Sequence, residues 1–119
     1  MTEPALGEYL RQRREALQAE DRTFSVRGVA RMAEIEPSYL SKIERGIEAP
    51  PSEPTIRRLA VVLGDDPDLL LALAGKVSDD LQAVIRRRPQ LFADLIRQLD
   101  EAPDHAVLRI TREIRDGSW

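Results

Sequence analysis

Hydrophobic residues recur at helical spacing along most of this chain. Near the N-terminus, Leu6, Leu10 and Leu17 fall close to positions i, i+4 and i+11, which predicts a helix over about residues 5–17. No stretch alternates apolar and polar residues over several positions, so the sequence gives no signal for a β-strand. We therefore expect an all-α protein.

Typical start and stop residues divide the chain up to Gly75 into further helices. Ser25 and Asp66 stand where N-caps are expected, and glycines follow the predicted C-terminal turns. The proline-rich stretch "APPSEP" reads as a rigid connector. Four helices are predicted over about residues 26–33, 37–45, 53–63 and 67–74. With the first helix they form a predicted five-helix domain covering residues 1–75.

Residues 76–119 are predicted to form a short helical extension, with helices over about residues 79–88, 89–99 and 105–116. This length is close to the ~40-residue limit for independent folding. Its apolar stripes must therefore be covered, either by the first five helices or by a second copy of the chain. We assign them to a dimer interface. Its predicted residues are Phe92, Leu95, Ile96, Leu99, Val107, Ile110 and Ile114.

Composition narrows the protein class. The chain is 42% hydrophobic and 33% charged, which suits a soluble helical protein. It has no cysteine, which excludes disulfides and thiolate metal sites. There is no apolar run of the ~18 residues that a membrane span requires, and "MTEPALGEYL" lacks the layout of a signal peptide. We expect a cytoplasmic protein with no membrane contact.

The net charge of −3 is unusual for a nucleic-acid-binding protein, so any DNA contact must come from a local basic surface. On a helix over residues 37–45, the side chains of Ser38, Ser41, Lys42 and Arg45 share one stripe, opposite the apolar positions 40 and 43. An ordinary solvated helix face would show a similar stripe. However, the preceding "MAEIE" is only long enough for a tight turn between two short helices, which favours a helix-turn-helix.

The stretch "FSVRGVARMAEIEPSYLSKIERG" resembles the phage-repressor (Cro-like) family of helix-turn-helix proteins, also called the xenobiotic-response-element family of bacterial transcriptional regulators. The resemblance covers about residues 5–75 and implies a lambda-repressor-like DNA-binding domain. It further implies that the helix at 37–45 lies in the major groove of an inverted-repeat operator, as part of a dimeric repressor. The candidate DNA-binding residues are Ser25, Arg27, Arg31, Pro37, Ser38, Tyr39, Ser41, Lys42 and Arg45.

The chain departs from the family pattern at two positions. Glu34 occupies the turn position that glycine usually holds, and a left-handed conformation costs a non-glycine residue roughly 1 kcal/mol. This predicts a differently shaped turn. Val26 replaces the glutamine that often follows the capping serine, so Arg27 and Arg31 are expected to supply the phosphate contacts instead.

No catalytic or metal-binding constellation can be assembled from the sequence, so neither an enzyme nor a cofactor is expected. Besides double-stranded DNA and a second copy of the chain, a protein partner is a candidate. The extension has a weak resemblance to regulators that are inactivated by a partner metallopeptidase. A competing hypothesis is an antitoxin that neutralises a toxin and regulates its own operon. Trp119 is a further candidate for a partner contact, although a terminal tail is mobile by default.

Overall fold

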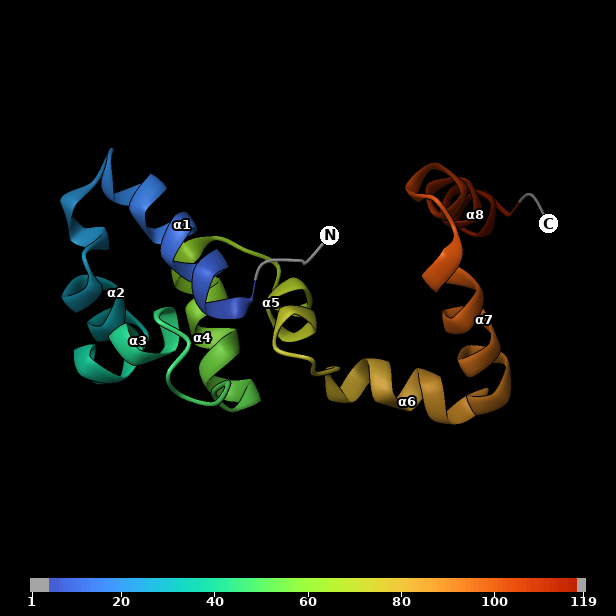
Figure 1. Ribbon diagram of the computed structural model, residues 1–119, viewed down its shortest axis with the longest axis horizontal. Helices are drawn as coiled ribbons and strands as arrows, with labels where there is room; N and C mark the ends of the chain where they lie inside the picture. Colours follow the sequence, from blue (N-terminus) through green and yellow to red (C-terminus); the bar gives the residue numbers. More distant parts are fainter. Residues whose placement is uncertain (1–4, 118–119) are drawn as a thin grey trace. The chain divides into compact units, whose positions relative to one another are not determined.

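The structure of the chain is a computed structural model that describes residues 5–117, and all of its regular elements are helical (Figure 1). The prediction of an all-α protein is confirmed for these residues. Along the chain the helical elements are α1 (Leu6–Gln18), the 3-10 helix η1 (Arg22–Phe24), α2 (Val26–Met32), α3 (Pro37–Glu44), α4 (Glu53–Leu63), α5 (Pro67–Leu73), α6 (Asp79–Arg87), α7 (Pro89–Glu101) and α8 (Asp104–Asp116). Trp119 lies outside the described residues.

Contacts within the chain divide it into two units, with the boundary after Ser78. The first unit holds the hydrophobic core, to which each of α1 to α5 contributes. In this unit α1 packs against α3, α2 packs against α3, and α4 packs against α5. The fully or nearly fully buried apolar residues are Leu6, Leu10, Val29, Ala30, Ala33, Leu40, Ile43, Ile56, Leu59, Ala60, Leu63, Leu70 and Leu71.

The turn between α2 and α3 has the common left-handed form, so the predicted change of shape is wrong. Glu34 adopts φ 61°, close to the φ of 72° at Gly46 after α3. The amide of Ile35 donates to the carbonyl of Ala30 at 2.9 Å, and the amide of Glu34 donates to that of Arg31 at 3.2 Å. This pair of bonds is the Schellman arrangement that ends many helices. The bonds and the burial around the turn therefore outweigh the strain at Glu34.

Gly28 of α2 is required by the close packing of this helix against η1. A Cβ atom on Gly28 would collide with the carbonyl oxygen of Thr23, which belongs to η1. This element was not foreseen, because no helix was predicted between residues 17 and 26. Asp21 caps it, accepting from the amide of Thr23 at 3.0 Å, and this bond lowers the pKa of the Asp21 carboxyl. Gly28 thus lets η1 lie directly against α2.

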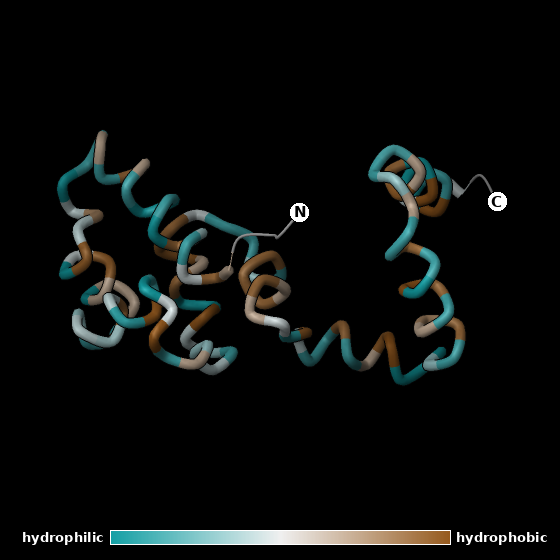
Figure 2. The backbone as a smooth tube through the Cα atoms, viewed as in Figure 1, coloured by the Kyte–Doolittle hydropathy of each residue, from teal (hydrophilic) through white to brown (hydrophobic). Residues whose placement is uncertain are grey.

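The second unit consists of α6, α7 and α8, and hydrophobic positions recur along all three helices (Figure 2). None of the described residues of these helices is buried. Leu91 is 68% exposed, Leu95 42% and Ile114 61%. The unit therefore presents uncovered apolar side chains.

None of the helices in the described part of the chain is long and apolar enough to cross a membrane.

Candidate nucleic-acid interface

Helices α2 and α3 are fixed by caps at their starts and by apolar anchors beneath. The Ser25 hydroxyl accepts a hydrogen bond from the amide of Gly28 at 3.1 Å and so caps α2. Pro37 opens α3, where its missing N–H has no intrahelical partner to lose. Leu40 and Ile43 are 1% and 3% exposed and hold α3 on the core. These interactions leave the opposite side of α3 facing solvent.

A buried ion pair ties the C-terminal end of α3 to α1. The Nε and Nη2 atoms of Arg14 donate to the two carboxylate oxygens of Glu44 at 2.7 and 2.9 Å. Arg14 also donates to Gln18 at 3.1 Å and to the carbonyl of Phe24 at 3.4 Å, which connects the same guanidinium to η1. The bonds to Glu44 raise the pKa of Arg14, so its charge is retained. Arg14 therefore fixes α3 relative to α1 and η1.

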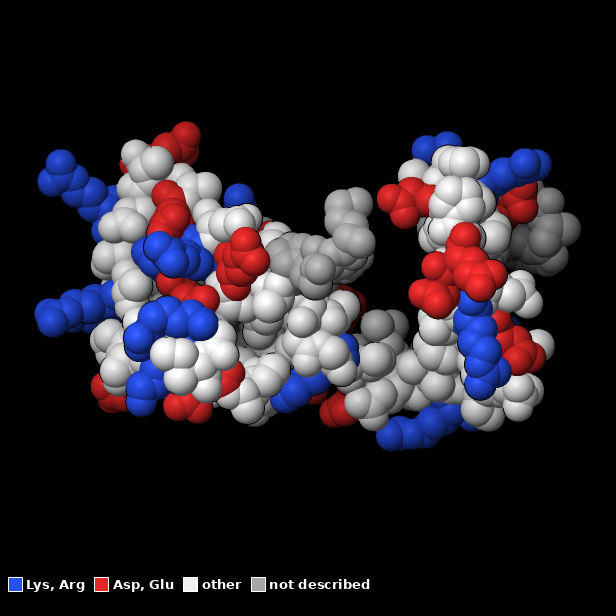
Figure 3. All heavy atoms as spheres, viewed as in Figure 1, with Lys and Arg blue, Asp and Glu red and all other residues white. Residues whose placement is uncertain are grey.

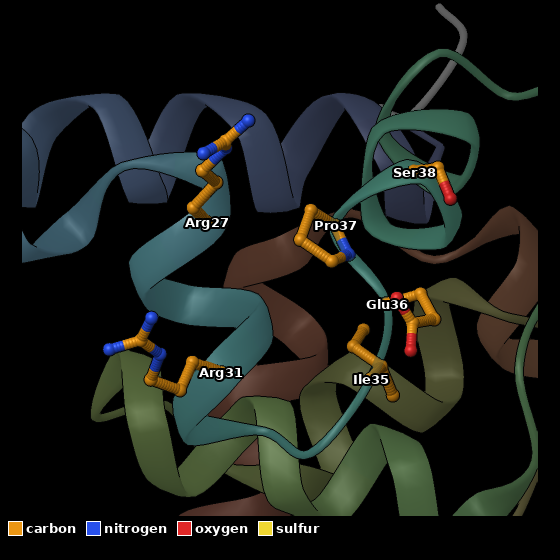
Figure 4. Close-up of a pocket in the computed structure, with 6 residues that line it drawn as sticks. All are labelled: Arg27, Arg31, Ile35, Glu36, Pro37 and Ser38. Atoms are coloured by element: carbon orange, nitrogen blue, oxygen red, sulfur yellow. The ribbon is translucent and has the colours of Figure 1, made fainter.

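The structure brings four of the predicted DNA-binding residues together around one open hollow of about 610 Å³. Figure 4 shows that the side chains of Arg27 and Arg31 both project outward from α2, while Pro37 and Ser38 come from the start of α3. Ile35 and Glu36, from the connection between the helices, complete the lining. Arg27, Arg31 and Ser38 are exposed. The hollow is thus lined by side chains of both helices of the pair.

The remaining predicted residues differ in how free their side chains are. Lys42 is exposed on α3. Arg45, the residue directly after this helix, is also exposed, and its Nε donates to the carbonyl of Ser41 at 3.3 Å. Ser41 is half-buried. Tyr39 is also half-buried and packs against the core, so part of its side chain has a structural role. The hydroxyl of Ser25 is already engaged as a helix cap.

Most of the basic side chains in residues 5–78 are held by groups of the same chain. Arg11, Arg13, Arg14 and Arg57 form ion pairs, and Arg45, Arg58 and Lys76 donate to backbone carbonyls. In this described region the exceptions are Arg22, Arg27, Arg31 and Lys42, which we call the unpaired basic set. All four are exposed and lie on η1, α2 or α3. Figure 3 shows basic side chains projecting from the edge of the unit where α2 lies.

Several residues of this region were not predicted from the sequence. Arg22 lies in a segment with no periodic pattern, and only the short element η1 places it beside α2. Arg14 and Glu44 are 30 residues apart, so no local spacing pairs them. The position of Arg14 was a weak signal. Arg14 falls four residues after the buried Leu10, so helical spacing places this charged residue on the buried face of α1. Among residues 5–117 no group of three or more histidine or acidic side chains has the geometry to hold a metal ion.

Comparison with known proteins gives one result for this region. A family model described as a helix-turn-helix domain matches residues 5–73, which is more than half of the chain and includes α1 to α5. No curated protein and no solved structure gave a significant match. The match covers the α2–α3 pair, the hollow and the unpaired basic set.

Proposed function

The chain belongs to the helix-turn-helix domain family, and we propose that it is a transcriptional regulator that binds specific sequences in double-stranded DNA. The observation that carries the proposal is the position of the unpaired basic set. Cations without an acidic partner are free to neutralise phosphates, and all four lie on the segment that contains the helix-turn-helix. A chain of net charge −3 thus keeps a local basic surface.

Within this proposal, α3 enters the major groove. Its start carries Pro37 and Ser38, which are small enough to approach base edges, and Lys42 follows one turn later with a free ammonium group. Lys42 is assigned to a base or an adjacent phosphate, because lysine commonly pairs with the O6 and N7 acceptors of guanine. Arg27 and Arg31 contact phosphates from α2, and this places the helix pair on the duplex.

We further propose that the protein acts as a dimeric repressor on an inverted repeat. One helix-turn-helix contacts few base pairs, and two-fold dimers read two half-sites about 34 Å apart or a multiple of that distance. The uncovered apolar side chains of α7 and α8 support an interface between two copies, since exposed apolar surface of this kind marks interaction sites. The seven residues predicted for the dimer interface all lie on these two helices and are exposed or half-buried.

The same uncovered surface supports two alternatives. An antitoxin, or a repressor controlled by a metallopeptidase, would offer α7 and α8 to a different protein. Genes for a small toxin or a metallopeptidase beside the gene for this chain would favour these readings. A stable homodimer of the purified chain would favour the dimeric repressor whose α7 and α8 contact a second copy of the chain.

The test of DNA recognition is selection of bound sequences from a random duplex pool, followed by titration of the enriched sequence. We expect an inverted repeat. Lys42→Ala should weaken binding to it by ~1–3 kcal/mol if the lysine reads a base. Arg11→Ala is the matched control, because Arg11 is exposed but paired with Glu15 at 3.0 Å on α1.

Each outcome of this test has a definite meaning. A pool with no enriched sequence would contradict the proposed function. An enriched sequence bound equally well by the Lys42→Ala variant would keep the function and remove Lys42 from the interface. Equal losses for the Lys42 and Arg11 variants would indicate a general effect of charge and not a contact at α3.

A further inference from the structure

We propose that Glu36 is a specificity-determining residue that selects cytosine in each half-site. The proposal rests on the proposed function, because it names one base contact of the same interface. Glu36 was not among the residues predicted from sequence, where it looks like one of several acidic residues in an acidic chain. Its position, together with the absence of a side-chain partner in the part of the chain that the structure describes, sets it apart.

Glu36 is the residue immediately before α3 and lines the hollow with Arg27, Arg31 and Ser38. Its backbone carbonyl accepts the first bond of the helix, from the amide of Leu40 at 3.1 Å. The side chain makes no capping bond, although it occupies the N-cap position. The helix thus fixes the Glu36 backbone and leaves the carboxylate free.

The carboxylate has no lysine or arginine as an ion-pair partner among residues 5–117. It forms no ion pair with Arg27 or Arg31, and Figure 4 shows it on the other side of Pro37 from both guanidinium groups. Because Pro37 and Ser38 are short and Tyr39 packs against the core, Glu36 is the longest exposed polar side chain at the start of α3. A polar group that reaches beyond the first turn of α3 would meet whatever that end of the helix approaches.

A carboxylate can contact only part of a DNA surface favourably. When ionised it accepts hydrogen bonds and donates none, so phosphates and the acceptor atoms of guanine and thymine repel it. Cytosine presents an N4 amino group in the major groove, and carboxylates accept from this group. Adenine also presents an amino group, but beside the N7 acceptor, which repels the second carboxylate oxygen. Cytosine is therefore the favoured base.

The experiment compares sequences selected by the full-length protein and by Glu36→Gln. Glutamine is similar in size and pairs through both its donor and its acceptor with adenine. We expect one position of each half-site to change from cytosine to adenine, with a discrimination of roughly 5- to 150-fold at that position. Glu34→Gln is the matched control, because Glu34 is also exposed and acidic but does not line the hollow.

Other outcomes would overturn the assignment. If Glu36→Gln selects the same sequence as the unmodified protein, Glu36 does not read a base. If it binds every sequence more tightly without a change in preference, the carboxylate only lies near phosphates. A change in unfolding temperature alone would indicate a favourable interaction with the start of the helix and no recognition. Failure of the unmodified protein to select any sequence would instead contradict the proposed function.

Discussion

At the scale of single residues, the buried Arg14–Glu44 pair joins the end of α3 to α1. Both side chains are almost fully buried, at 8% and 5% exposed. A buried charge is costly unless its partner satisfies it, so each residue stabilises the fold only while the other is present. Glu44 is the last residue of α3, and the pair therefore anchors the end opposite to Pro37 and Glu36.

Removing one member of this pair should destabilise the protein strongly. We expect Arg14→Met to lower the free energy of unfolding by about 3–5 kcal/mol, because Glu44 would remain buried without a cation. The double variant with Arg14→Met and Glu44→Leu should recover most of this loss, since apolar side chains of similar volume often replace buried pairs at little cost. Urea unfolding measures both values. A double variant no more stable than the single one would show that the site requires the charges themselves.

The environment of a single residue could be predicted where residues nearby in the sequence determine it. Helical spacing alone placed the apolar positions 40 and 43 opposite the polar stripe of α3, and the structure buries both Leu40 and Ile43. The left-handed conformation of Glu34 was judged unfavourable from its side chain. It was adopted because hydrogen bonds from Glu34 and Ile35 close the end of α2. Hydrogen bonds that offset backbone strain in this way cannot be predicted from the residue type at the turn alone.

At the scale of elements, η1, α2 and α3 form the surface that would meet DNA. Arg27 and Arg31 lie one turn apart on α2, and in Figure 4 both side chains extend away from the helix. Since neither has an acidic partner in the described chain, each can release one counterion from the duplex when it contacts a phosphate. Their contribution should therefore appear mainly in the salt dependence of binding.

Replacing both arginines with glutamine should reduce this salt dependence. The logarithm of the binding constant falls with the logarithm of salt concentration by about 0.9 per phosphate contacted, so the slope should become shallower by about 1.8. Titration of the operator at several salt concentrations measures it. The matched control replaces Arg11 and Arg57, which are paired with Glu15 and Glu53. An equal change of slope in the control would mean that total charge, and not α2, sets the dependence.

Most element boundaries could be predicted because the chain marks them with caps. Ser25, Asp66 and the glycines at the helix ends gave the bounds of α2 to α5 to within one or two residues. The exception was η1, whose three residues are too few to show a period. Its position depends on the close approach of Thr23 to Gly28, which is a contact in space and not a pattern in sequence.

At the scale of the whole molecule, the two units differ in how many of their residues are buried. The first contains a buried core, whereas the second has no buried residue among those described on its helices. From the sequence, the domain boundary is predicted near residue 76. Ser78, however, is 2% exposed and Lys76 donates to the carbonyl of Pro51 at 2.9 Å. A shortened chain should therefore retain these residues.

A chain that ends at Ser78 should stay folded and lose the proposed dimer. Light scattering should give a dimer mass for the full chain and a monomer mass for the shortened one, while circular dichroism retains a helical spectrum. In the full chain, Leu95→Asp should also produce monomers, because it introduces a charge on the uncovered apolar surface of α7. Gln98→Asp on the same helix is the control. A shortened chain that remains a dimer would place the interface within the first unit.

The uncovered apolar side chains of α7 and α8 have a consequence for how the protein would respond to its own abundance. If two copies must meet before the operator is bound, occupancy at low concentration rises with the square of the amount of chain. Halving the amount would then reduce occupancy by about fourfold, whereas a monomer would lose only half. Removal of the extension by a protease would act on the same equilibrium. The uncovered apolar surface of α7 and α8 would thus make operator occupancy depend steeply on the concentration of the chain.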